Sequence, residues 1–407
     1  MANYSKREKN ILDEIKKLDI SPTMYLNAKE KYQAIAKYLQ NNGVECEFYP
    51  QGSFATGTIV RPIKYENTPS YDLDAVCKII IDKNGTDPDT IKSMIGDVLK
   101  DSGYTIDKEF DTCWTVKYAD VNGVGFSIDI VPAVEEDDIT KRQLSLKAAY
   151  PELIDSSIAI TFKENDEYIW HTNNPKGLIS WFSSINSRFK DYNRDERRLA
   201  IFNENQSLFN SVEEIPDETE RSALQIAIQL LKRHRDLFYA EISSHNNKIQ
   251  KPTSAIILIL SSIIAQKIDI LDNPFVLVSY IVNELKQYSE LQIKPQHLFE
   301  ISNLDKKTIS KKDNTWCLVN PANPEDNLLD NWNDEDAKAF FNWIDAVYND
   351  YSQLSKYSDL EYSAFLENAI GKKAANTFSA PMQKSNQNNI VPQIVSPAKP
   401  WSNNYDI

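Results

Sequence analysis

The chain has 407 residues, of which 41% are apolar and 26% charged, and its formal net charge is -14. At roughly 150 residues per domain, this length predicts about two packed lobes. Proteins that grip long duplex nucleic acid show a basic face, so no long nucleic acid is expected as a partner. The acidic balance favours small phosphorylated substrates, because bound metal ions can supply the positive charge locally.

The sequence also predicts a cytoplasmic protein. Its four cysteines are far apart and form no CxxC pair, which argues against a zinc site and suits a reducing compartment. The polar N-terminus is unlike a signal peptide. The longest apolar run, residues 255–265, is too short to span a bilayer, so no membrane partner is expected.

The first part of the chain predicts a mixed α/β lobe that ends near residue 165. Helical spacing covers residues 5–42, and Ser21-Pro22-Thr23 divides it into a short helix and a longer one over about 22–42. The strand 73–81 is expected to be buried, including Ile80 and Ile81. The other expected elements are strands at 44–49, 104–110, 113–119 and 124–131, a hairpin turn at 120–123 and an amphipathic helix at 88–99.

After residue 165 the apolar pattern becomes helical. Helices are expected at 175–191, 218–243, 253–268, 273–289, 295–302 and 334–370. The end of the chain is rich in Asn, Gln, Pro and Ser, which predicts a flexible tail. The fold class is therefore α+β, with units at 1–165, 166–375 and 376–407.

The sharpest motif is Tyr71-Asp72-Leu73-Asp74. Side chains alternate along a strand, so Asp72 and Asp74 project from the same face and repel each other. A divalent cation relieves that repulsion and makes a compact site of oxygen ligands. The alternative is a pair of solvated acids at a strand end.

A third acid strengthens the metal-site interpretation. Asp129 lies in the apolar strand Phe126-Ser127-Ile128-Asp129-Ile130-Val131, where a buried carboxylate is costly unless it is paired or bound to a metal. Taken alone, Asp129 could equally be a partly exposed residue of an edge strand. Together with Asp72 and Asp74 it completes the ligand set of a two-metal site.

A Gly/Ser-rich segment, residues 51–58, precedes the paired acids. Gly52 lets the backbone approach a phosphate closely, and Ser53 offers a hydroxyl and an N–H group as donors. Ser53 also begins a stretch that could turn helical and aim free N–H groups at an anion. The alternative is an ordinary turn; the GxxxxGK[ST] pattern of phosphate loops is absent from the sequence.

The combination of Gly52-Ser53, Asp72-x-Asp74 and Asp129 resembles the DNA polymerase β nucleotidyltransferase superfamily. Within it, residues 51–58, 71–74 and 230–236 resemble the bacterial CD-NTases, which are relatives of cyclic GMP-AMP synthase and oligoadenylate synthase. The similarity covers roughly residues 45–265. It implies a polymerase-β-like lobe and a helical lobe that completes the nucleotide site, braced by a long N-terminal helix.

The resemblance also implies an activity. CD-NTases make cyclic di- or trinucleotide signals from ATP, GTP, UTP or CTP with release of pyrophosphate, in CBASS-type anti-phage signalling where an effector protein responds to the product. Asp72, Asp74 and Asp129 would hold two Mg²⁺ ions, with Mn²⁺ as an alternative. Gln51, Gly52 and Ser53 would bind the nucleotide.

Lys232 and Ser254 match the family more loosely, and Asn173 is a separate candidate. Lys232 resembles a helix lysine that contacts the triphosphate, and it offers a point charge to phosphate. Ser254 resembles a serine with the same role, at an expected helix N-terminus. Asn173 lies where the lobes should meet, and its amide could read a base edge. The alternatives are a solvated lysine, an ordinary N-cap and turn chemistry.

The sequence departs from its relatives in two places. The stretch from Ser53 to Asp72 is longer than in cyclic GMP-AMP synthase, and the C-terminus does not end in a small residue. Two rival functions stay open. One is the same chemistry on another acceptor, such as a tRNA or RNA end, an antibiotic or a protein side chain. The other is a degenerate fold that only binds a nucleotide or partner.

Overall fold

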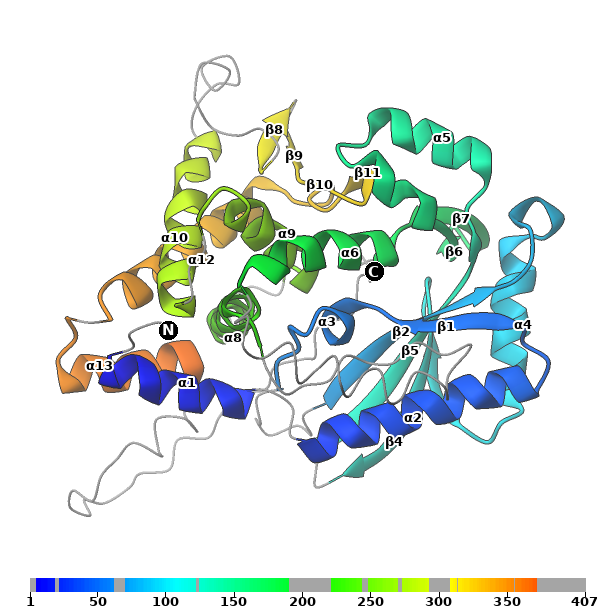
Figure 1. Cartoon of the computed structure of the whole chain (residues 1–407), viewed down its shortest axis with the longest axis horizontal. Helices are drawn as coiled ribbons and strands as arrows, with labels where there is room; N and C mark the ends of the chain where they lie inside the picture. The colour runs from blue at the N-terminus through cyan, green and yellow to red at the C-terminus, as the bar shows by residue number, and fades with distance from the viewer. Residues whose placement is uncertain are drawn as a thin grey trace.

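The chain folds into a sheet lobe, built on a mixed β-sheet, and a helical lobe (Figure 1). The structure is a computed structural model. The α+β class expected from the sequence is confirmed, whereas the expected helix 295–302 and the tail 376–407 lie outside the described residues. The structure describes residues 5–18, 22–61, 70–121, 124–189, 221–243, 248–269, 273–292, 308–312, 314–354 and 356–371.

The sheet of the described chain has seven strands in the order β1-β2-β5-β4-β3, with β6 beside the end of β5 and β7 beside β6. Strands β2 and β5 are parallel, and every other pair is antiparallel. The sheet continues past residue 165 to Asn173. The strands are β1 Cys46–Pro50, β2 Ser70–Ile79, β3 Thr105–Glu109, β4 Trp114–Val121, β5 Val124–Glu135, β6 Ile158–Glu164 and β7 Glu167–Asn173.

The two faces of the sheet differ because side chains alternate along each strand. Leu73 and Ala75 of β2 point to one face, where helices α2 (Pro22–Asn41) and α4 (Pro88–Lys100) bury them in one apolar core. Asp72 and Asp74 point to the other face. One face of the sheet thus packs into the apolar core, and the other face carries the polar side chains of the candidate site.

Helix α4 shows how the sequence builds the covered face. Asp87 caps the helix by accepting a hydrogen bond from the Thr90 N–H, and Pro88 fits the first turn, where its missing N–H is not needed. Ile91, Ile95 and Leu99 follow at four-residue spacing and are fully buried. The predicted helix 88–99 is confirmed.

The helical lobe packs its helices around a second apolar core that includes the buried Trp316 and Trp343. A short α5 (Asp138–Lys147) and two small hairpins accompany these helices. The helices are α6 Pro175–Asn186, α8 Ala223–Ser243, α9 Ser254–Ala265, α10 Pro274–Lys286, α12 Asp334–Ser352 and α13 Asp359–Phe365, and the hairpin strands are β8 Ser310–Lys312, β9 Thr315–Cys317, β10 Val319–Asn320 and β11 Asn323–Asn327.

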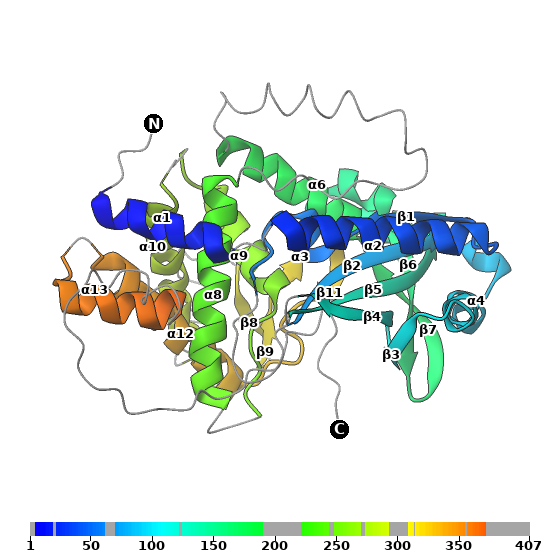
Figure 2. The same ribbon diagram turned by 90° about the horizontal axis from the view of Figure 1, so that it is seen from below.

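Two N-terminal helices, α1 (Lys6–Leu18) and α2, brace the molecule instead of one long helix (Figure 2). Helix α1 lies on the helical lobe, where the Tyr362 hydroxyl donates to the Arg7 carbonyl at 3.2 Å. Helix α2 lies on the sheet lobe, where the Tyr71 hydroxyl donates to the Met24 carbonyl at 2.9 Å. Each helix therefore anchors one lobe.

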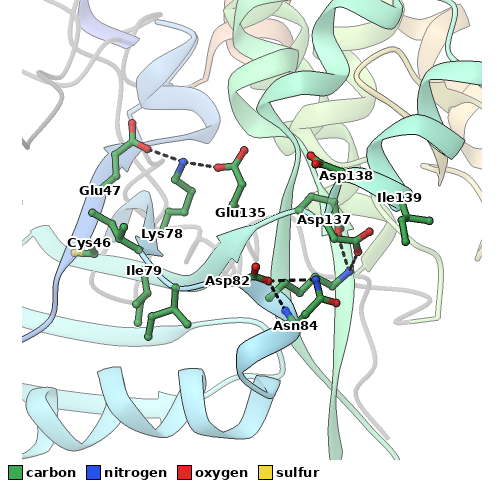
Figure 3. Close-up of a pocket in the computed structure, with 14 residues that line it drawn as sticks. Cys46, Glu47, Lys78, Ile79, Asp82, Asn84, Glu135, Asp137, Asp138 and Ile139 are labelled. Carbon is green, nitrogen blue, oxygen red and sulfur yellow. Dashed lines mark hydrogen bonds and ion pairs between the residues drawn. The ribbon is translucent and has the colours of Figure 1, made fainter.

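The expected burial of Ile80 and Ile81 is wrong. Strand β2 ends at Ile79, the last residue paired with β5, so the next two side chains lose their sheet neighbours and are 65% and 38% exposed. They line an open groove of about 860 Å³ at this end of the strands. In that groove Lys78 bridges Glu47 and Glu135 (Figure 3).

Candidate active site

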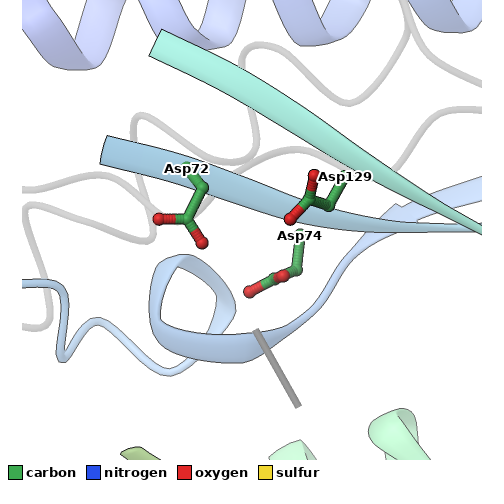
Figure 4. A group of neighbouring side chains, drawn as sticks. All are labelled: Asp72, Asp74 and Asp129. Carbon is green, nitrogen blue, oxygen red and sulfur yellow. The ribbon is translucent and has the colours of Figure 1, made fainter. Parts of the chain in front are cut away.

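Three carboxylates meet on the open face of the sheet. Asp74 and Asp129 are direct partners across the parallel strands β2 and β5, and Asp72 lies two residues before Asp74 on the same face. One oxygen from each side chain lies within 4.8 Å of the others, and the three groups point toward one another (Figure 4). Residues far apart in the sequence thus form one acidic cluster.

This cluster carries a large electrostatic cost. Asp74 and Asp129 are only 6% and 5% exposed. Burial raises the pKa of Asp72 to about 6. Burial also raises the pKa of Asp74 well above its ordinary value, and the neighbouring Asp72 and Asp129 raise it further. Carboxylates that repel one another in a buried place are a donor set that suits a hard divalent cation.

Thr115 fixes the orientation of the third carboxylate. It lies opposite Asp129 on β4, and its hydroxyl donates a hydrogen bond to Asp129 Oδ1. Thr115 is itself buried, so this donor is held in place by the sheet. The other oxygen of Asp129 remains able to face the cluster.

The Gly/Ser segment lies directly beside the acids. The Gln51 N–H donates to the Asp74 carbonyl at 2.8 Å, and a single helical turn, α3 (Gly52–Ala55), follows. Gly52 has a φ of +66°, in the left-handed region that favours glycine. Ser53 is partly exposed within α3. The expectation that this stretch turns helical is confirmed.

Helix α8 clamps the segment that follows α3. Gln225, Gln229 and Lys232 lie on one face of the helix at spacings of four and three residues. Gln225 Nε2 donates to the Thr56 carbonyl at 2.9 Å, and Gln229 Nε2 donates to the Ile59 carbonyl at 2.7 Å. These bonds join the helical lobe to the backbone that leaves the Gly/Ser turn.

Lys232 belongs to the same clamp and interacts electrostatically with Asp72 and Asp74. Its Nζ donates to the carbonyl and to the hydroxyl of Thr58, both at 3.1 Å. Burial lowers the pKa of Lys232 to about 7 and nearby Arg235 lowers it further, whereas Asp74 and Asp72 are among the carboxylates that raise it. A buried ammonium group therefore lies within electrostatic reach of the acidic cluster.

Ser254 is the first residue of α9 and not its cap. The cap is Thr253, whose hydroxyl accepts a hydrogen bond from the Ile256 N–H. The preceding loop is tied to α8, because Arg235 Nη1 donates to the Pro252 carbonyl at 2.9 Å. Ser254 therefore follows a loop anchored one helical turn beyond Lys232, and its role in nucleotide binding stays a prediction.

Asn173 lies at the end of β7 and lines a small cavity of about 40 Å³ next to the acids. It is thus in a strand, although the sequence left open whether this stretch was a turn. Several residues of this wall carry no signal of their own in the sequence, because only the packing of the strands brings them to the cavity. The cavity is lined by Gln51, Asp74, Thr112, Cys113, Asp129, Val131, Ile160 and Asn173.

The Second Messenger Oligonucleotide or Dinucleotide Synthetase domain, SMODS, matches residues 6–186. A c-di-GMP synthase of Roseivirga ehrenbergii is 27% identical over 358 residues, which cover 86% of this chain and 79% of that protein. The cyclic dinucleotide synthase CdnG of Bradyrhizobium diazoefficiens is 25% identical over 244 residues, covering 55% of this chain and 51% of CdnG.

The solved structure of Bradyrhizobium diazoefficiens CdnG in complex with GTP shares the fold. It superposes with a TM-score of 0.63 at 16% identity, covering 92% of this chain and 98% of CdnG. Within the described residues, no helix combines the length and apolar character needed to cross a membrane. Residues 6–186 thus match the SMODS domain, the sequence is similar to two bacterial cyclic dinucleotide synthases, and the fold is that of a bacterial CD-NTase.

Proposed function

We propose that this chain joins nucleoside triphosphates into a cyclic di- or trinucleotide with release of pyrophosphate, using Asp72, Asp74 and Asp129. The observation that carries the proposal is the convergence of these three carboxylates within 4.8 Å. The SMODS match and the similarity to a c-di-GMP synthase support it. The candidate substrates are ATP, GTP, UTP and CTP, and the GTP complex of CdnG supports a nucleoside triphosphate at this site.

We propose Mg²⁺ as the metal, with Mn²⁺ as an alternative. Hard cations prefer carboxylate oxygens. Burial raises the pKa of Asp74, and so does repulsion from Asp72 and Asp129, which a bound cation would relieve. Asp72 and Asp74 would hold the ion on the triphosphate, and Asp129 would help to hold a second ion. Two such ions, when bound, acidify the attacking hydroxyl and neutralise the leaving pyrophosphate.

The remaining residues bind and orient the nucleotide. Gln51, Gly52 and Ser53 lie beside Asp74, and Lys232 and Ser254 lie on the helical lobe, so the triphosphate would be held between the lobes. A ribose hydroxyl then attacks the α-phosphorus in line. A new P–O bond forms, the hydroxyl proton leaves to solvent, and the bond to pyrophosphate breaks. A further step of the same kind closes the ring.

We also propose the biological setting that the family suggests. The product would act as a signal in CBASS-type anti-phage defence within the cytoplasm, and an effector protein would respond to it. No long nucleic acid is needed for activity in this account, and the net charge of -14 agrees with that. Asn173, in the cavity wall, is a candidate reader of a base edge.

The test is incubation of the whole chain with the four nucleoside triphosphates and Mg²⁺, without any acceptor. We expect pyrophosphate release and a phosphatase-resistant product whose mass identifies its bases and ring size. If a product forms only when an RNA end, an antibiotic or a protein is added, the chain is a transferase that uses that acceptor and not a cyclase. Absence of pyrophosphate release under every condition would leave only a nucleotide-binding role.

A further inference from the structure

Two aromatic rings lie stacked on strands β6 and β7 of the sheet. The ring centroids of Phe162 and His171 are 4.2 Å apart, and the ring planes differ by only 9°. Phe162 is on β6 and His171 is on β7, in diagonal positions of the antiparallel pair. The imidazole is exposed and the phenyl ring half-buried, so the pair presents an aromatic surface to solvent.

The stacked pair lies on the same face of the sheet as the small cavity next to the acids. Asn173 follows His171 by two residues and Ile160 precedes Phe162 by two, so each pair shares one side of its strand. Ile160 and Asn173 line the cavity next to Asp74 and Asp129. Two residues of strand span about 7 Å. The rings therefore begin about one nucleoside length from the cavity wall.

A carboxylate from the other lobe lies within electrostatic reach of His171. Asp326 belongs to β11, and that strand is tied to β7 because Asn323 Nδ2 donates to the Thr172 carbonyl at 3.0 Å. Burial lowers the pKa of His171, while the nearby carboxylates of Glu164 and Asp326 raise it. Asp326 is therefore close enough to the imidazole to interact with it electrostatically.

The geometry of Asp326 leaves it free to accept further hydrogen bonds. Asn320 Nδ2 donates to Asp326 Oδ2 at 2.9 Å and fixes the side chain. Among the residues that the structure describes, the Oδ1 atom accepts no hydrogen bond, and the side chain is only half-buried. A carboxylate has about four lone-pair sites, so Asp326 can accept from two adjacent donors.

We propose that Phe162 and His171 form a stacking platform for one nucleobase, and that Asp326 selects guanine on it. Every base has a π-face that stacks on an aromatic ring. Guanine presents adjacent N1–H and N2–H donors that match a carboxylate, whereas adenine presents one amino donor beside an acceptor nitrogen. This inference rests on the proposed function, because it assigns a base to the nucleotide site described above.

The test is calorimetric titration of the whole chain with non-hydrolysable GTP and ATP analogues in Mg²⁺. We expect His171→Ala to weaken binding of the GTP analogue on the order of tenfold, and His171→Phe to restore it, because the stacking ring returns. We expect Asp326→Asn to weaken binding of the GTP analogue but not that of the ATP analogue. Thermal unfolding of each variant shows whether the fold is kept.

Tyr38→Ala is the matched control. Tyr38 also belongs to a partly exposed aromatic pair, with Tyr104 at 5.6 Å, but it lies on α2, which covers the opposite face of the sheet. This variant should bind both analogues like the unmodified chain. Equal GTP affinity in His171→Ala and the unmodified chain would overturn the platform. An equal effect of Asp326→Asn on both analogues would overturn the selection of guanine.

These outcomes are separable from those of the proposed function, because binding is measured without turnover. A chain that forms cyclic product while His171→Ala keeps its full GTP affinity refutes only the base platform. A chain that binds as predicted but never releases pyrophosphate refutes the synthase and leaves the platform standing.

Discussion

Asp74 and Asp129 are paired residues on two neighbouring parallel strands, and both carboxylates are almost completely buried. Strands β2 and β5 thus force together two groups that repel each other. Such an arrangement stores unfavourable energy in the metal-free protein, and it is typical of sites whose function needs the charge.

The first prediction concerns Asp129→Asn. The amide keeps the acceptor for the Thr115 hydroxyl but removes one charge from the cluster. We expect product formation to fall by about a hundredfold or more. We also expect the metal-free variant to unfold at a higher temperature than the unmodified chain. Asp138→Asn, an exposed acid at the start of α5, is the control and should alter neither activity nor stability.

The second prediction concerns the pH dependence of stability without metal. The folded pKa of Asp72 is raised to about 6, above its ordinary value of 3.8. Between about pH 4 and pH 6 the folded state therefore holds more protons than the unfolded state, and the stability that Asp72 contributes is lost as pH rises. Measured in EDTA, the melting temperature of the unmodified chain should fall relative to Asp72→Asn across this range. If the melting temperatures of the two proteins change in parallel between pH 4 and pH 6, the raised pKa of Asp72 is contradicted.

The third prediction concerns proton uptake by Lys232. Burial lowers its pKa to about 7, so at pH 8 much of the side chain is neutral in the free protein. A bound triphosphate would favour the ammonium form and raise that pKa, so nucleotide binding should take up a proton. Lys232→Arg is always charged and should take up fewer protons. Calorimetry of GTP analogue binding in two buffers with different ionisation enthalpies measures the number of protons taken up. Equal uptake by both proteins would show that Lys232 does not contact the triphosphate.

The fourth prediction concerns the clamp between the lobes. Gln229→Leu removes the donor to the Ile59 carbonyl and leaves a buried acceptor without that bond. We expect the free energy of unfolding to drop by about 1–3 kcal/mol. Gln225→Leu should cost less, because Gln225 is only half-buried and water can replace both of its side-chain bonds, to the Thr56 carbonyl and from the Ser222 N–H. Chemical denaturation measures the free energy of unfolding of both variants. A larger loss for Gln225→Leu than for Gln229→Leu would argue against the clamp.

The local features of the site could be predicted from the sequence. Strands β2 and β5 are apolar runs interrupted by acids, and that contrast identifies both the strands and the acids that face away from the core. The turn at Gly52 was also readable, because a Gly/Ser segment between two strands is a local signal. These features depend on neighbouring residues and on side-chain alternation alone.

The rest of the site depends on tertiary contacts that the sequence does not display. Gln225 and Gln229 look like ordinary polar positions of a helix, and their carbonyl partners lie about 170 residues earlier in the chain. Strand β7 was missed because its residues run directly into the Asn-Pro start of α6, which resembles a turn. The exposure of Ile80 could not be foreseen, because it depends on where the pairing with β5 ends.

The catalytic role of the acidic cluster is tested most sharply by comparing the unmodified chain with the double variant Asp72→Asn and Asp74→Asn. Pyrophosphate release from a mixture of nucleoside triphosphates is followed at saturating Mg²⁺, and thermal unfolding is recorded for both proteins. We predict that the double variant folds at least as stably and releases no pyrophosphate above background. Full pyrophosphate release by a folded double variant would contradict the assignment of these carboxylates as the catalytic metal site.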